Sequence, residues 1–144
     1  YRTNNPDVLV VTSREIADEI AATDYPQNNI VLARNEHIKK HPGLFHLIPY
    51  NNYTDAGSTA LRMACFDGHK KVFLLGYDSY HNTADHLTQT FFVKALETVA
   101  TTYSDVEFVR VIDHVDYPLA DELAVLPNFR QISFRDFVLE ADIG

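Results

Sequence analysis

Short runs of consecutive apolar residues, separated by segments with helical spacing, constrain the fold of this chain more than any other feature. The clearest runs are "DVLVVT" (7–12), "NIVLA" (29–33), "KVFLLG" (71–76) and "VEFVRVI" (106–112). A strand that is apolar throughout is covered on both faces, and such strands alternating with helices predict a parallel sheet. We therefore expect one α/β domain over residues 1–144. Its predicted architecture is three-layer α/β/α, with a mostly parallel, doubly wound, Rossmann-like sheet of about five to six strands.

The remaining segments complete this α/β pattern. Capping residues, apolar spacing and helix breakers predict five helices. They run from after Ser13 to about Ala22, from Asn35 to Lys40, from Asp55 or Ser58 to Gly68, from His86 to Tyr103 and from Phe134 to Glu140. Residues 44–49 and 129–133 are expected to be extended, and Pro26 to Asn29 to form a turn.

Composition narrows the classes of function. Apolar residues make up 46% of the chain and charged residues 22%, as in soluble globular proteins, and no run is long enough to span a membrane. The net charge of −8 argues against a nucleic-acid partner, because phosphate binding needs clustered Lys and Arg. The single cysteine, Cys65, cannot form an internal disulfide, which suits a cytoplasmic protein.

In parallel α/β sheets, ligands bind beyond the carboxyl ends of the strands. The loops at 12–13, 49–57 and 76–86 are expected at that edge. The segment from Asp55 to His81 spans two of these loops, so it is the first place to look for a binding site.

The residues of this segment follow a known order. Gly57-Ser58 is followed by Ala60-Leu61 and Ala64, then by Gly68-His-Lys70, then by the run from Val72 to Gly76-Tyr-Asp78-Ser-Tyr80. This order resembles the core of the bacterial family-42 sialyltransferases, and much of it is shared by the MptE-like pterin diphosphokinases and the Maf flagellin glycosyltransferases. In those families a Ser/Gly turn opens a helix, and a strand ends in Gly-x-Asp-x-Tyr. The match covers about 30 residues well and extends loosely to Val109.

The resemblance implies a nucleotide or nucleotide-sugar ligand, of the CMP-sugar type, and roles for individual residues. The turn formed by Ala56, Gly57, Ser58 and Thr59 would face the nucleotide, together with Gly76 and Asp78. Tyr80 would match a tyrosine that donates to the donor phosphate, and His86 would match the catalytic histidine. These roles agree with the chemistry of helix N-termini, phenols and imidazoles.

The chain also departs from those families, and several interpretations stay open. The families begin with a strand leading to a Gly-x-Gly-Pro-Ser turn, which this sequence lacks, and Asp55-Ala56 replaces a Thr-Ser. Either the missing turn lies upstream, or the chain keeps the scaffold without transferase activity. The alternative function is a non-catalytic Rossmann-like interaction module that self-associates, and a third is a diphosphokinase relative.

Simpler structural interpretations compete with each functional role. Gly57 can serve a tight turn, Gly68 a helix C-cap, Asp78 a turn cap, and His86 the start of a helix. No cofactor is expected. No metal site is expected either, although three groups of polar residues were weighed for one: His81, Asp85 and His86 near Asp78; His37 with His41; and His114 between Asp113 and Asp116. Cys65 is expected to behave as a small apolar side chain.

Overall fold

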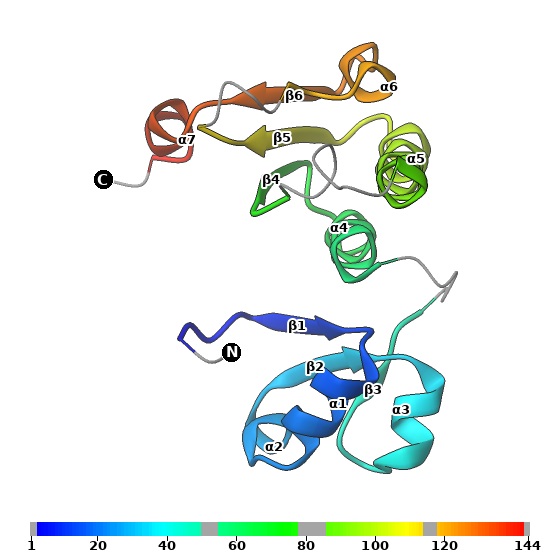
Figure 1. Cartoon of the computed structure of the whole chain (residues 1–144). Helices are drawn as coiled ribbons and strands as arrows, with labels where there is room; N and C mark the ends of the chain where they lie inside the picture. Colours follow the sequence, from blue (N-terminus) through cyan, green and yellow to red (C-terminus); the bar gives the residue numbers. More distant parts are fainter. Residues whose placement is uncertain (1–2, 50–54, 78–85, 114–117, 143–144) are drawn as a thin grey trace. The chain divides into compact units, whose positions relative to one another are not determined.

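The computed structural model describes residues 3–49, 55–77, 86–113 and 118–142, with side chains in the first turn of the helix at residue 86 left out of the description. The chain forms two compact units, Tyr1–Thr59 and Ala60–Gly144, and each is described by itself below. Figure 1 labels the elements. The prediction of one domain over 1–144 stays a prediction.

The elements alternate between strand and helix along most of the chain, which confirms an α/β fold. The bounds are β1 Val8–Val11, α1 Arg14–Ala21, α2 Tyr25–Asn28, β2 Ile30–Ala33, α3 Asn35–Lys40, β3 His46–Leu47, α4 Ala56–Phe66, β4 Lys71–Leu75, α5 His86–Thr102, β5 Glu107–Val111, α6 Asp121–Ala124, β6 Phe129–Ile132 and α7 Phe134–Glu140. The short helix α2 stands where a turn was predicted, and α6 was not predicted. Within the described ranges, no helix has the length and apolar character needed to cross a membrane.

The strands form two separate sheets rather than one continuous sheet. In the first unit the order is β1-β2-β3, and in the second it is β4-β5-β6, with every described pair parallel. The parallel arrangement and the number of strands in the described ranges agree with the prediction. The single doubly wound sheet does not, because no described hydrogen bonds join the two triplets.

The first unit packs its helices on one face of its sheet. Its core consists of Val11, Ala17, Ile20, Val31, Ala33 and Phe45, with Leu9, Ile16, Ala21, Tyr25, Ile38 and Leu44 packed against it. The Ser13 hydroxyl accepts the N–H of Ile16 and caps α1 as predicted. Asp18 of α1 contacts Lys40 and His41 at 2.7 Å each, which fastens α1 to the end of α3.

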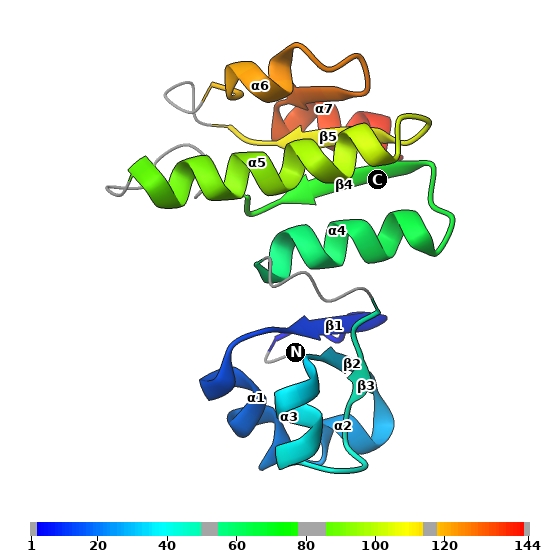
Figure 2. The same cartoon turned by 90° about the vertical axis from the view of Figure 1, so that its right-hand side faces the viewer.

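The second unit is layered on both faces of its sheet (Figure 2). Helices α5 and α6 cover one face and α7 covers the other. The core on the α5 side includes Leu74, Phe108 and Phe129 of the three strands, and Leu61 and Cys65 of α4. On the other face Phe73 packs edge-on against Phe137 of α7, with ring centroids 5.0 Å apart. This arrangement explains why residues 72–75 of β4 are apolar on both faces of the sheet.

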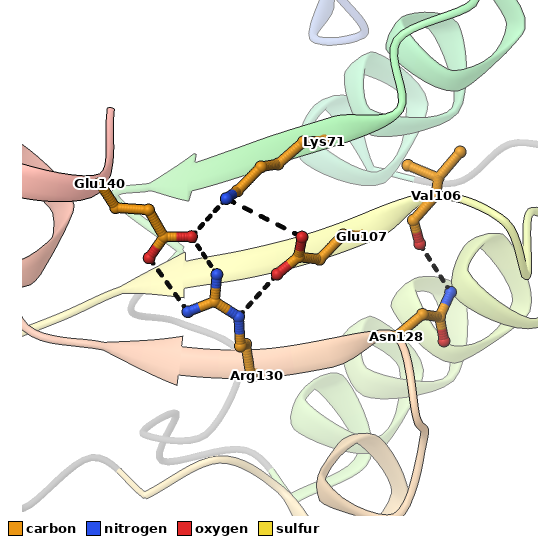
Figure 3. Close-up of polar contacts among 6 residues, drawn as sticks. All are labelled: Lys71, Val106, Glu107, Asn128, Arg130 and Glu140. Carbon is orange, nitrogen blue, oxygen red and sulfur yellow. Dashed lines mark hydrogen bonds and ion pairs between the residues drawn. The ribbon is translucent and has the colours of Figure 1, made fainter. Parts of the chain in front are cut away.

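Four charged side chains join α7 to the amino end of this sheet (Figure 3). Arg130 donates to Glu107 at 2.7 Å and to both carboxylate oxygens of Glu140, and Lys71 also pairs with Glu140. Hydrogen bonds from Arg130 and then Lys71 lower the pKa of Glu140 to about 2. We call these four residues the ionic cluster.

The ionic cluster predicts a definite response to acid. Because the pKa of Glu140 falls from 4.5 to about 2 on folding, its carboxylate stabilises the fold fully above pH 4.5. That stabilisation is lost as the pH falls from 4.5 towards 2. Thermal unfolding of wild type and Glu140→Gln should therefore differ most near neutral pH and converge as the pH falls to about 2. Glu122→Gln, in the first turn of α6, is the control. Equal pH profiles for wild type and Glu140→Gln would contradict this role.

Candidate functional site

The carboxyl ends of β4, β5 and β6 lie at one edge of the second unit's sheet. The register aligns Leu75 with Val111 and Val111 with Ile132, so the residues that follow these three emerge together. Helix α5 also begins at this edge, because it runs antiparallel to β4 (Figure 2). This is the edge at which parallel sheets bind ligands.

Part of this edge serves to start α7. The Asp113 carboxylate accepts the N–H of Phe134 at 2.6 Å, and the Ser133 hydroxyl accepts the N–H of Asp136 at 3.1 Å. Two of the free N–H groups at the helix start are thereby satisfied. Asp113 after β5 and Ser133 after β6 therefore cap the start of α7. The part of the edge that remains for a candidate site is the end of β4 and the α5 side of β5.

Gly76 ends β4 in a conformation that other residues avoid. Its φ is +77°, and no described atom lies within 4 Å of the position that a Cβ would occupy. The next residue, Tyr77, is half-buried and packs against the core of the second unit. The strand therefore ends at a backbone position that carries no side chain.

The start of α4 is the other predicted part of the site. An Asp55 carboxylate oxygen accepts the N–H of Ser58 at 3.2 Å, and the Asp55 carbonyl accepts the Thr59 hydroxyl at 2.8 Å. Ser58 and Thr59 are 1% and 4% exposed. Of the two predicted helix starts, Asp55 is the one observed, as an N-cap, so a carboxylate already accepts one N–H group of this turn.

The predicted site residues fall in both units and in segments outside the described ranges. Ala56, Gly57, Ser58 and Thr59 fall in the first unit and Gly76 in the second. Asp78, Tyr80, His81 and Asp85 lie outside the described residues. His86 is the first residue of α5, as predicted, and its side chain is not described. The functional assignments of these residues stay predictions.

The backbone conformation decides between the structural roles predicted for Gly68 and Gly57. Gly68 has a φ of +98°, and its N–H donates to Cys65 at 3.0 Å while the N–H of His69 donates to Ala64 at 3.2 Å. It is the C-cap that the sequence predicts for α4. Gly57, in contrast, lies inside the first turn of α4, so its interpretation as a tight turn is wrong.

Arg110 is a candidate residue that sequence reasoning missed. It is the penultimate residue of β5 and is 1% exposed, and its Nη1 donates to the Gln131 side chain at 3.0 Å. The register places it between Leu74 and Gln131, in a row of the sheet that faces the core on the α5 side. The signal was present in "VEFVRVI", where a charged residue occupies an inward position of a buried strand.

Two of the histidines weighed as metal ligands, His37 and His41, have structural partners. His37 is buried, and its Nε2 lies 3.1 Å from the carbonyl of Thr12 at the end of β1. His41 contacts Asp18 at 2.7 Å. Asp113 caps α7, and His114 and Asp116 lie outside the description. In the ranges that the structure covers, no three His, Cys, Asp or Glu side chains gather as a metal site would require.

Cys65 is buried on the inner side of α4, as the sequence predicts. Burial raises the pKa of its thiol to about 11. Because the thiolate is the reactive form, this cysteine is unsuited to nucleophilic chemistry at neutral pH.

Comparison with known proteins gives no match to this chain among family models, curated proteins or solved structures.

Proposed function

We propose that this chain is a nucleotide- or nucleotide-sugar-binding domain of Rossmann-like type, with its ligand at the carboxyl edge of the β4-β5-β6 sheet. The observation that supports it best is the end of β4. There a glycine in the left-handed region removes the side chain that would otherwise stand at the edge. Close approach of a ligand's phosphate or sugar to the backbone needs such a position.

The ligand class rests on the resemblance of residues 57–80 to sialyltransferase-like proteins. In this proposal a CMP-linked sugar is held at the carboxyl edge of the second unit by Gly76, Asp78 and Tyr80. His86 takes the proton of an acceptor hydroxyl, whose oxygen forms the new glycosidic bond. The bond between the sugar and the phosphate oxygen breaks, and CMP leaves with the bonding electrons. A domain that binds the nucleotide without transferring the sugar would use the same binding residues, but His86 would not act as a base.

Two matched glycine variants test the location of the ligand. Gly76→Ala and Gly68→Ala each place a methyl group at a positive φ, which costs roughly 1–2 kcal/mol. They lie at opposite ends of β4, because Gly68 precedes the strand and Gly76 follows it. Calorimetric titration with CMP and CDP should show binding to wild type and Gly68→Ala, and at least fivefold weaker binding to Gly76→Ala. If neither nucleotide binds wild type, the proposed function is wrong.

A second pair of measurements separates transfer from binding. His86→Gln should bind CMP as wild type does and lose transfer of the sugar from a CMP-linked donor. Equal transfer by wild type and His86→Gln would remove the general-base role. Binding without transfer in wild type would identify a binding domain without transferase activity.

Exposed apolar side chains favour the alternative, an interaction module that self-associates. Phe134 and Leu139 of α7 are 50% and 72% exposed, and Val125 after α6 is 78% exposed. Exposed apolar and aromatic groups on one element are typical of interfaces. Light scattering should show an oligomer that Phe134→Ser with Leu139→Ser disrupts, whereas a wild-type monomer at all concentrations would count against this alternative.

A further inference from the structure

Helix α7 is attached to the second unit through little buried apolar surface. Of its seven residues, all within the described ranges, only Phe137 is buried, and its ring packs on Phe73 of β4. Phe134 and Leu139 are at least half exposed. On the opposite face, the described part of α5 buries five side chains: Val93, Ala95, Leu96, Val99 and Ala100. A segment that buries so little opens at a lower free energy than the core beside it.

Polar contacts hold both ends of α7. Its first turn is capped by Asp113 and Ser133. In its last turn, Glu140 pairs with Arg130 and Lys71 of the ionic cluster. The side chains of these three residues are between 25% and 40% exposed, so ions in solution screen their attraction. The strength of the attachment at this end therefore depends on the ionic strength.

The sheet beneath α7 carries apolar side chains. The register places Val109 of β5 beside Phe73 in one row of the sheet, and the alternation of side chains along a strand puts Val111 on the same face. Both valines are buried, and α7 covers this face (Figure 2). Opening of the helix therefore uncovers apolar surface.

We infer that α7 is a releasable strap, which opens and closes as a unit while the rest of the second unit stays folded. The ionic cluster controls how often it opens, and this inference does not rest on the proposed function. The charged groups that face Glu140 are Arg130 of β6 and Lys71 of β4, and both also pair with Glu107 of β5. Salt weakens these pairs, and protonation of Glu140 in acid removes its own. Either change increases the fraction of time that α7 spends open.

Native-state hydrogen exchange on the full chain, measured by NMR at increasing urea concentrations, tests the strap. The amides of residues 137–140 of α7 should share one protection factor, at least tenfold below that of residues 108–111 of β5, the central strand of its sheet. Their protection should also depend less steeply on urea, because opening one helix exposes less surface than unfolding the whole unit. Equal protection and equal urea dependence in α7 and β5 would mean that the helix opens only when the unit unfolds, and the inference would be wrong.

Salt and one substitution test the control by the ionic cluster. Between 0.01 M and 1 M NaCl the Debye length falls from about 30 Å to about 3 Å, and the protection of the α7 amides should fall at least threefold. Glu140→Gln should lower this protection at least fivefold in 0.01 M NaCl and abolish the response to salt. Asp136→Asn is the matched control, because it removes the same charge from the same helix, and the Asp136 contact with Ser133 is made by its backbone N–H. The control should keep the threefold response.

The salt titration of wild type carries the test even if Glu140→Gln does not fold. Protection of the α7 amides that is the same at both salt concentrations would overturn the inference. A salt response of equal size in wild type and Glu140→Gln would overturn it too, because the ionic cluster would then not control the helix.

Discussion

Replacing Asn128 by Asp should destabilise the second unit by about 3 kcal/mol. The Asn128 side-chain NH₂ donates to the carbonyls of Ala100 at 3.0 Å, Tyr103 at 3.2 Å and Val106 at 2.9 Å. Figure 3 shows the last of these contacts. The Ala100 carbonyl belongs to the last turn of α5, where no intrahelical partner remains, and the Tyr103 carbonyl, directly after the helix, also accepts the N–H of Val106. A carboxylate cannot donate and repels all three oxygens.

Urea unfolding followed by far-UV circular dichroism measures this loss. Asn29→Asp is the matched control, because the Asn29 side chain donates to a single carbonyl, that of Tyr25, at 3.0 Å. We expect the control to lose about 1 kcal/mol. A loss at Asn128 no larger than at Asn29 would show that the three contacts do not hold the end of α5 in place.

Phe108→Ala should cost the second unit about 3–5 kcal/mol in free energy of unfolding. The Phe108 side chain is fully buried in β5 and stacks on Phe129 of β6, with centroids 5.9 Å apart and planes at 19°. Removing the ring leaves a cavity between the sheet and α5 that rigid neighbours can fill only in part. The same urea titration measures the change.

Phe91→Ala is the matched control for this core substitution. Phe91 lies on α5 and is 50% exposed, so its removal opens no cavity and should cost about 0.5 kcal/mol. A similar small loss for Phe108→Ala would mean that the sheet face is not covered as described.

Local signals in the sequence predicted most elements of the fold correctly. Ser13 and Asp55 begin helices and Gly68 ends one, because each acts through hydrogen bonds within a few residues of itself. The helix α2 was interpreted as a turn, since Pro26 is equally acceptable in the first turn of a helix. The four-residue helix α6 is too short to show a helical period.

Features that depend on distant pairing could not be predicted. The division into two sheets follows from which strands bond, and no property of a single strand encodes its neighbour. In the ionic cluster, Lys71 and Glu140 are brought together only by the sheet and α7. Arg110 was visible as a charge in an apolar strand, yet its contact with Gln131 depends on the register of β5 and β6.

The place of the ionic cluster has a consequence for engineering this protein. Lys71 and Glu107 are the first residues of their five-residue strands, so roughly 13 Å of strand separates them from the last residues at the carboxyl edge. That span exceeds the Debye length of about 8 Å at physiological ionic strength, and the cluster's side chains are partly in solvent. Screening therefore isolates the two ends, and charge changes at the amino end can tune acid tolerance without altering the affinity of the ligand site that we propose at the carboxyl end.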